Sequence, residues 1–223
     1  MQKKIVIAGA GDMLGRRLVR DFVRFGWKVY AGYIGNEPSQ VAESVTAFAF
    51  DPLDHAGILA EAGKIGEAID MLLINIDGGI CCDCGTVLDE IDYDAMINAY
   101  EYNTMGPMRV VNAFLPLLEK GEGKRIGFVT TRSSSNYLCD AVTGLADHVS
   151  RAPLNMAITQ LFNGLRPDGY TFRAYVKDTE NGRDEWASDF FIRDRSYADG
   201  ELLKHNDEDR IVLYDWTSRQ IPY

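Results

Sequence analysis

The segment from Lys3 to Gly15, KKIVIAGAGDMLG, shows how the fold begins. A short run of Ile and Val, typical of a buried β-strand, leads to Gly9, and apolar residues recur at helical spacing after the turn that follows. Gly9, Gly11 and Gly15 stand at this turn, where glycine permits a tight bend and lets the backbone approach a phosphate at the helix N-terminus. The stretch therefore predicts a strand, a turn and a helix that begin an α/β fold.

Strands and helices alternate along the rest of the chain. Apolar runs predict strands at 27–33, 47–50, 70–76, 125–131, 170–176 and 211–215. Helical patterns cover 53–68, 89–119 and 147–165, and the second of them is interrupted near Gly106. This order predicts one domain over residues 1–223, an α/β fold with a three-layer, doubly wound parallel sheet of about seven strands. Residues 177–210 are acidic and poor in aliphatic side chains, and we expect a polar surface excursion there.

Composition excludes several classes of protein. The 223 residues include 33 acidic and 23 basic ones, and a net charge of -10 leaves no basic surface for a nucleic-acid backbone. No run approaches the roughly 18 apolar residues of a transmembrane helix, and the N-terminus leads directly into a strand instead of a signal peptide. We expect a cytoplasmic protein that binds a small molecule and neither nucleic acid nor a membrane.

Short motifs then follow one another in the order typical of one family. These are AGAGDMLG at the first turn, FDPLD around Asp51, NIDG from Asn75, YNTMGPMRVVNAFLPLL around Asn103, GKRIGFVTT ending at Thr131, and SRAPLNM from Ser150. From about Lys3 to Trp216 the chain resembles the short-chain dehydrogenases/reductases, whose TGxxxGxG turn, NNAG segment and SKAALNM segment these motifs are similar to. The resemblance implies a Rossmann fold that binds NAD or NADP at the carboxyl ends of the first and fourth strands.

The resemblance assigns a set of residues to this cofactor. They are Gly9, Gly11, Asp12, Met13, Leu14, Gly15, Tyr33, Asp51, Pro52, Asn75, Asp77, Gly78 and Arg151. Met13 replaces the middle glycine of the family's turn, and Lys177 with Asp178 replaces the Pro-Gly that supports the nicotinamide in the family. The second strand ends without an acid for the NAD ribose and without an arginine for the NADP phosphate, so both cofactors stay open.

The resemblance also implies an active site formed by Asn103, Thr131, Asp147, His148 and Arg151. Asn103 and Thr131 stand where the family has the Asn and Ser that act on the substrate oxygen. The family's YxxxK motif is missing, because Asp147 and Arg151 stand at the Tyr and Lys positions. An aspartate is normally ionised at neutral pH, and Arg151 at spacing i,i+4 favours that charged form. Asp147 must then act as a base or become protonated through burial, unless His148 transfers the proton.

The replacement of the family's Tyr and Lys leaves three hypotheses for the function. The first is an oxidoreductase that acts on a small carbonyl or alcohol. The second is a catalytically inactive dinucleotide-binding or ligand-sensing protein on the same fold, and the third is a changed reaction such as epimerisation, dehydration or elimination. Members of the family commonly form dimers or tetramers through the helices at 92–119 and 147–165, so we expect a homodimer or homotetramer.

Several polar residues near the turn and the loops have two interpretations each. Arg16 and Arg17 stand in the first helical turn, where the macrodipole disfavours cations, and they either neutralise a phosphate or lie in solvent. Asp12 either caps the helix or repels a pyrophosphate. The hydroxyls of Ser133, Ser134, Ser135 and Tyr137 either replace the missing proton donor or only line the site. The spacing of Cys81, Cys82, Cys84 and Cys139 matches zinc sites poorly, so we expect no metal.

Overall fold

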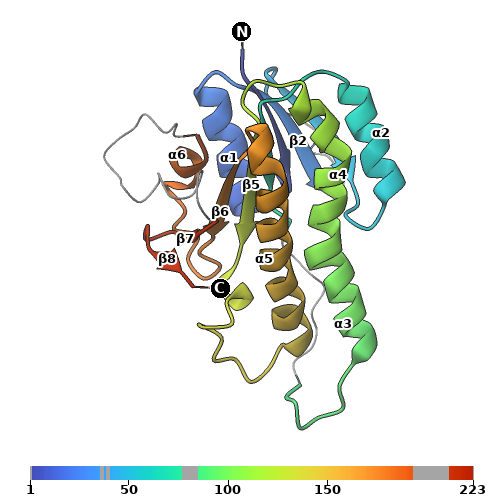
Figure 1. Cartoon of the computed structure of the whole chain (residues 1–223), viewed down its shortest axis with the longest axis vertical. Helices are drawn as coiled ribbons and strands as arrows, with labels where there is room; N and C mark the ends of the chain where they lie inside the picture. Colours follow the sequence, from blue (N-terminus) through green and yellow to red (C-terminus); the bar gives the residue numbers. More distant parts are fainter. Residues whose placement is uncertain (1, 36–37, 39–40, 77–84, 193–210, 223) are drawn as a thin grey trace.

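The computed structural model describes residues 2–35, 38, 41–76, 85–192 and 211–222. They form one sheet in the order β3-β2-β1-β4-β5-β6-β7-β8 (Figure 1). All neighbouring strands are parallel except the last pair, which is antiparallel. The predicted doubly wound α/β fold is confirmed. The sheet has eight strands instead of about seven, because the two-residue strand β8 is too short to show a periodic pattern.

The predicted elements correspond closely to the observed ones. The strands are β1 (Lys4–Ala8), β2 (Lys28–Ile34), β3 (Val45–Phe50), β4 (Met71–Ile74), β5 (Arg125–Thr130), β6 (Thr171–Val176), β7 (Leu213–Asp215) and β8 (Gln220–Ile221). The α-helices are α1 (Met13–Arg24), α2 (His55–Ile65), α3 (Tyr93–Tyr100), α4 (Gly106–Glu119), α5 (Leu145–Leu165) and α6 (Ala187–Ile192). Among the described residues, no helix is both long enough and apolar enough to cross a bilayer.

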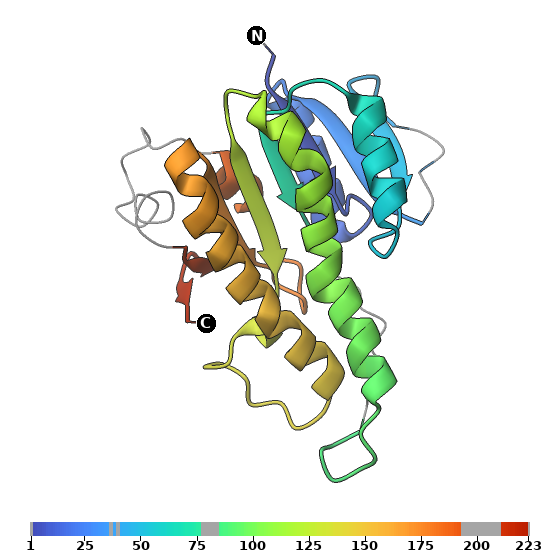
Figure 2. The ribbon, with the colours of Figure 1, turned by 45° about the vertical axis from the view of Figure 1, so that its right-hand side comes forward.

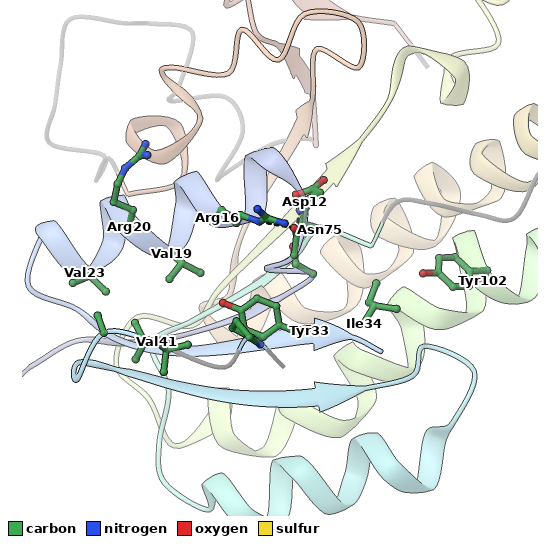
Figure 3. A pocket seen from close by; sticks show the side chains of 15 residues that line it. Asp12, Arg16, Val19, Arg20, Val23, Tyr33, Ile34, Val41, Asn75 and Tyr102 are labelled. Atoms are coloured by element: carbon green, nitrogen blue, oxygen red, sulfur yellow. Dashed lines mark hydrogen bonds between the residues drawn. The ribbon is translucent and has the colours of Figure 1, made fainter. Parts of the chain in front are cut away.

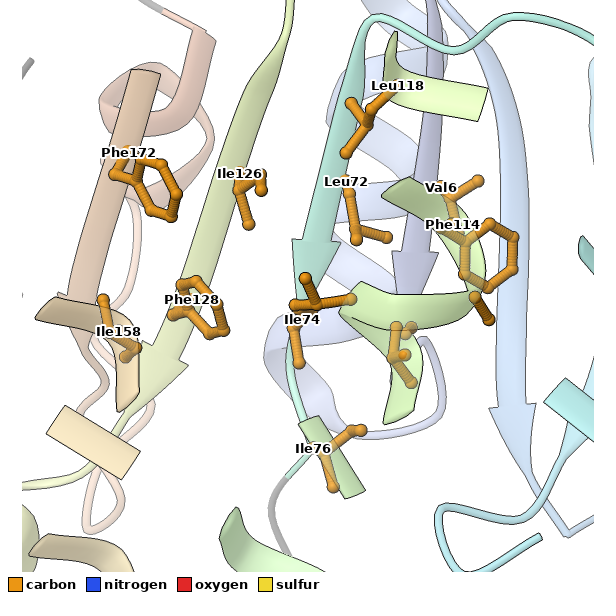
Figure 4. Packing of buried hydrophobic residues seen from close by; sticks show 14 of the residues in the cluster. Val6, Leu72, Ile74, Ile76, Phe114, Leu118, Ile126, Phe128, Ile158 and Phe172 are labelled. Carbon is orange, nitrogen blue, oxygen red and sulfur yellow. The ribbon is translucent and has the colours of Figure 1, made fainter. Parts of the chain in front are cut away.

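Two hydrophobic cores cover the two faces of the sheet. Successive side chains of a strand point to opposite faces, so Val6 of β1 enters one core while Ile5 and Ile7 enter the other. Helices α2, α4 and α5 cover the first face, and α1 and α6 cover the second (Figures 1 and 2). In the first core, Phe114 of α4 packs among the aliphatic side chains of β1 and β4 (Figure 4).

The interruption predicted near Gly106 is a π-helical segment, Glu101–Met105, between α3 and α4. The residue after this segment is Gly106, and a Cβ atom there would stand only 2.9 Å from Cβ of Pro52, so glycine permits the close approach. Arg109 binds the carbonyl oxygens of Pro52 and Glu101, at 3.3 and 3.2 Å, and so joins the two chain segments. Wide turns of this kind occur often at functional sites, and this one contains the buried Asn103.

The predicted polar excursion begins with a segment that packs against the sheet. Phe190 and Phe191 of α6 are fully buried, as are most atoms of Asp178 and Asp184. The carboxylate of Asp178 accepts hydrogen bonds from the backbone amides of residues 180, 181 and 183 and from the guanidinium of Arg183. These bonds compensate the charge, so an acidic segment remains in contact with the core. Residues 193–210 lie outside the described residues.

We expect acid to remove the stabilisation that Asp178 provides. Burial raises the pKa of this carboxyl, but the bonds from Arg183 and the three amides outweigh it and hold the pKa at about 2 instead of 3.8. The folded state therefore binds its proton later than the unfolded chain, and stability is lost as the pH falls from about 4 towards 2. The melting temperatures of wild type and Asp178→Asn, compared from pH 2 to 6, should differ above pH 4 and converge at pH 2. A difference that does not change with pH would contradict this cause.

Candidate functional site

A cavity of about 920 Å³ opens beside the carboxyl ends of β1, β2 and β4. The strand order reverses between β1 and β4, and in open α/β sheets ligands bind at such a point. Gly9 and Gly11 form one wall, and Tyr33 with Ile34 at the end of β2 form another (Figure 3). The third wall is the face of α1 that carries Arg16, Val19, Arg20 and Val23.

The three glycines of the turn have different reasons to be glycine. Gly9 has φ +103°, and a Cβ atom there would stand 1.8 Å from the carbonyl oxygen of Asn75. A Cβ atom on Gly15 would stand 2.2 Å from the carbonyl oxygen of Gly9. Gly11 is different, since its nearest neighbour would be Cδ1 of Tyr33 at 3.8 Å. Packing of the chain itself therefore requires Gly9 and Gly15, whereas Gly11 leaves open space at the cavity.

Asp12 is the N-cap of α1, as one of the two interpretations predicted. Its Oδ1 accepts from the backbone amide of Gly15 at 2.6 Å and from Nδ2 of Asn75 at 2.8 Å. Its Oδ2 accepts from Nζ of Lys177 at 2.8 Å. Nδ2 of Asn75 also donates to the carbonyl oxygen of Gly9 at 2.8 Å. The turn, the end of β4 and the end of β6 are thus joined through one carboxylate.

Arg16 is a cation of the cavity wall, and Arg17 is not. Nε of Arg16 donates to the carbonyl oxygen of Gly11 at 2.8 Å, which holds the side chain along the turn. Figure 3 shows its guanidinium directed towards Asp12 and Asn75. Burial raises the pKa of Tyr33 above its ordinary value, and the charge of Arg16 partly opposes this rise. Arg17 instead lies 3.7 Å from Glu185 at the surface.

The predicted cofactor residues divide into two groups. Gly9, Gly11, Asp12, Tyr33 and Asn75 line the cavity, whereas Met13, Leu14, Gly15, Asp51, Pro52 and Arg151 do not. In the second group Leu14, Gly15 and Pro52 are buried, and Met13 is 67% exposed. Asp51 is exposed and accepts from the backbone amide of Leu53 at 2.8 Å. Asp77 and Gly78 lie outside the described residues, as do Cys81, Cys82 and Cys84.

A second polar cluster lies where the π-helical segment meets α5. Nδ2 of Asn103 donates to Oγ of Ser150 at 2.8 Å and lies 3.5 Å from Oδ1 of Asp147. Oγ of Ser150 in turn donates to the carbonyl oxygen of Asp147 at 2.8 Å. Oδ1 of Asn103 is buried and has no hydrogen-bond partner among the described residues. The cluster therefore presents an acceptor that a bound hydroxyl group would satisfy.

The predicted pairing of Asp147 with Arg151 is present in the structure. Nε of Arg151 donates to Oδ1 of Asp147 at 2.8 Å along one face of α5. The arginine side chain is 10% exposed and the aspartate side chain 22% exposed. The carboxylate of Asp147 therefore has a charged partner on its own helix.

Thr131 and His148, the other two predicted catalytic residues, make local bonds. Oγ1 of Thr131 lies 2.5 Å from Oγ of Ser133. Further along the same loop, the backbone oxygen of Ser134 accepts a hydrogen bond from Nδ2 of Asn155 on α5. Nδ1 of His148 lies 2.8 Å from the carbonyl oxygen of Gly144, one turn earlier in the chain. The loop after β5 is thus bonded to α5, on which the Asp147 cluster stands.

The sequence did not indicate a role in the site for Ser150 or for Lys177. The sequence marks Ser150 only as part of the SRAPLNM segment, although Ser150 binds Asn103, and it marks Lys177 only as a replacement for the family's Pro-Gly. The position of Lys177 directly after β6 is the available signal, because the carboxyl ends of parallel strands meet at the same edge of a sheet. Tyr137 is 76% exposed. Among the described residues, no cluster of His, Cys, Asp or Glu is suitable for a metal ion, and Cys139 is exposed.

Known proteins support this description of the fold. No family model matches the chain. A short chain dehydrogenase of Burkholderia cenocepacia, solved in complex with NADP, superposes with a TM-score of 0.71 at 22% identity over 86% of this chain and 84% of that chain. The chain has the short-chain dehydrogenase fold. The cavity described above opens at the carboxyl ends of the strands of this fold.

Curated proteins match parts of the sequence. C-signal of Myxococcus xanthus is 34% identical over 103 residues, which are 46% of this chain and 60% of the relative. The 1-hydroxy-2-glutathionyl-2-methyl-3-butene dehydrogenase of Rhodococcus sp. strain AD45 is 38% identical over 142 residues, which are 56% of this chain and 61% of the relative. The matches thus span about three fifths of the length of each relative.

Proposed function

We propose that the chain is a member of the short-chain dehydrogenase/reductase family that binds a nicotinamide dinucleotide and oxidises or reduces a small alcohol or carbonyl compound. The observation that carries this proposal is the cavity of about 920 Å³ at the point where the strand order reverses, with the glycine turn and the N-terminus of α1 at its wall. Support comes from the dehydrogenase among the relatives and from the NADP bound to the solved structure.

The residues present fit such a cofactor. Gly11 leaves open space beside the turn, and Oδ1 of Asn75 is buried at the cavity without a partner among the described residues. A ribose hydroxyl would satisfy this oxygen, and the aliphatic wall of Val19, Ile34 and Val45 suits a flat apolar ring. When bound, the nicotinamide ring accepts or donates a hydride. The adenosine half of the cofactor would be held by Gly11, Tyr33 and Arg16.

We expect the protein to bind NADPH more tightly than NADH. Arg16 lies beside Tyr33, at the end of the strand where the ribose phosphate of NADP would lie, and among the described residues no carboxylate stands at the end of β2 to repel that phosphate. Replacing Arg16 by Ala should weaken NADPH binding about tenfold and NADH binding much less, because one charge-assisted contact is lost. Isothermal titration calorimetry of both cofactors measures this difference.

Arg24→Ala is the matched control for this measurement. Arg24 is exposed, stands on the same helix and does not line the cavity. Its replacement removes the same charge and should leave both affinities unchanged. Equal losses of NADPH affinity in the two variants would indicate a general effect of charge and would contradict a specific contact of Arg16.

The cluster on α5 suits the oxidation of an alcohol better than the reduction of a carbonyl. In this direction the alcohol O–H bond would break and its proton would pass to the carboxylate of Asp147, and a bound oxidised cofactor would supply the hydride acceptor. Asn103 and Thr131 would orient the substrate oxygen. Arg151 would hold the carboxylate of Asp147 in place through their ion pair.

The same ion pair favours a second function without catalysis. With its carboxylate bound to Arg151, Asp147 lacks the proton that carbonyl reduction needs. The fold would then bind the dinucleotide as a ligand sensor. A screen of small alcohols with NADP⁺ and of aldehydes with NADPH, at saturating cofactor, separates the two functions: turnover supports the oxidoreductase, and binding without turnover supports the sensor.

We also propose that two copies of the chain associate through α3 and α5. Tyr93, Ile97 and Tyr100 recur at helical spacing on α3 and are 69%, 60% and 42% exposed. Val149 and Met156 on the adjacent α5 are 47% and 63% exposed. The two helices lie side by side (Figure 2). Exposed apolar side chains gathered on one face are typical of an interface.

Replacing Ile97 by Glu should convert a dimer to monomers in sedimentation velocity. A carboxylate buried without a partner at the interface opposes association. Leu59→Glu is the control, because Leu59 is 45% exposed on α2, away from this face. A wild-type protein that sediments as a monomer at tens of micromolar would contradict the proposal.

A further inference from the structure

Lys177 brings a cation to the glycine turn from a distant part of the chain. It directly follows β6, and its backbone amide donates to the carbonyl oxygen of Thr130 at 3.0 Å. Its side chain is only 10% exposed, and Nζ lies 2.8 Å from Oδ2 of Asp12. The two residues are 165 positions apart, so only the completed sheet brings this pair together.

The position of Asp12 makes this cation important. Its carboxylate accepts from the amide of Gly15 at the first turn of α1, which is where a diphosphate would find its donors. A second anion placed there would be repelled by Asp12, since like charges interact strongly in a partly buried site. Arg16 opposes this repulsion only in part, because its Nε is bonded to the carbonyl oxygen of Gly11.

A separate observation points to a ligand at this position. Asn75 is 2% exposed and lines the cavity, and its Nδ2 is bonded to both Asp12 and Gly9. Its Oδ1 is buried and has no partner among the described residues. No donor among the described residues reaches this acceptor, and a sugar hydroxyl next to a bound phosphate would satisfy it.

We propose that Lys177 is the residue that allows a diphosphate to bind beside Asp12, with its ammonium group shared between the carboxylate and the ligand. The natural ligand is then a diphosphate ester with a sugar hydroxyl near Asn75. This inference rests on the proposed function, in which that ester is a nicotinamide dinucleotide. Lys177 takes the place of the Pro-Gly of the related family, so the charge balance of the turn is a property of this chain.

The test is a double-mutant cycle read by calorimetry with inorganic pyrophosphate and with NADPH. The variants are Lys177→Met, Asp12→Asn and both together, and Asn at position 12 retains an oxygen that can cap α1. We expect Lys177→Met to weaken both ligands at least tenfold in the wild-type background. In the Asp12→Asn background, where no carboxylate needs neutralising, the same change should cost about threefold.

Two further variants separate charge from folding. Lys177→Arg keeps the charge and should keep most of the affinity, and Lys64→Met removes a lysine whose side chain is 71% exposed outside the cavity and should change nothing. Melting temperatures identify any variant that fails to fold. A folded Lys177→Met variant that binds pyrophosphate as tightly as wild type would contradict the proposal that the ammonium group is shared. An equal loss of affinity in the wild-type and Asp12→Asn backgrounds would contradict it as well.

The two ligands keep this inference distinct from the proposed function. Binding of pyrophosphate that depends on Lys177, without binding of NADPH, would sustain the diphosphate site and overturn the dinucleotide. Binding of NADPH that is indifferent to Lys177 would sustain the dinucleotide and overturn the role of Lys177. Failure of the wild type to bind either ligand would overturn both.

Discussion

Replacing Gly9 by Ala should lower the free energy of unfolding by on the order of 3 to 5 kcal/mol. At φ +103° a residue with a Cβ atom is strained, which alone costs about 1 to 2 kcal/mol. The added atom would also stand 1.8 Å from the carbonyl oxygen of Asn75, so β1 and β4 must separate at their carboxyl ends. The nearest atoms are all backbone atoms of Asn75, which cannot move aside as a flexible side chain would. Urea unfolding followed by circular dichroism measures the loss.

Two other glycines serve as controls for the two causes. Gly26 has φ +82° with no atom within 4 Å of an added Cβ, so Gly26→Ala isolates the backbone strain at about 1 to 2 kcal/mol. Gly11→Ala meets its nearest neighbour at 3.8 Å and should unfold nearly as wild type does. It should still weaken NADPH binding, because its methyl group occupies space beside the turn. If Gly9→Ala is no less stable than Gly26→Ala, the close approach to Asn75 is not the cause.

The sequence predicted the parts of this molecule that depend on local pattern. Continuous apolar runs such as MLLI of β4 indicated strands covered on both faces, and Met71 and Leu72 do enter opposite cores. Gly9 was identified because a tight turn between a strand and a helix requires its backbone conformation. The pairing of Asp147 with Arg151 followed from their spacing on one helix. Each of these inferences needs only a few neighbouring residues.

Contacts between distant segments were beyond sequence reasoning. The bond between Asp12 and Lys177 depends on where β6 lies relative to β1, and no periodicity encodes it. Residues 177–210 were predicted to be a surface excursion because of their charge. The described part of that range, 177–192, packs against the sheet instead, because the amides of the loop satisfy the carboxylate of Asp178 and leave Phe190 and Phe191 to fill the core. Composition indicated the charge of this segment but not its bonding.

Replacing Asp147 by Asn should reduce alcohol oxidation by about 10² to 10⁴ fold while NADPH binding is unchanged. Asn has nearly the same shape, and its Oδ1 still accepts from Nε of Arg151, so the ion pair becomes a hydrogen bond without a cavity. The amide cannot take the proton of the alcohol. Initial rates of NADP⁺ reduction at saturating alcohol, compared with cofactor affinity from calorimetry, separate the chemical step from binding.

Asp168→Asn is the control, because it makes the same change in an exposed residue just beyond the opposite end of α5. It should leave the rate unchanged. Arg151→Ala should also abolish turnover, since the carboxylate of Asp147 loses the partner that holds it in position. An Asp147→Asn variant as fast as wild type would contradict the role of Asp147 as base and direct attention to His148 of the same helix. Loss of rate in Asp147→Asn with retained NADPH affinity would instead mean that a carboxylate does the work of the family's tyrosine, in the direction that releases a proton from the substrate.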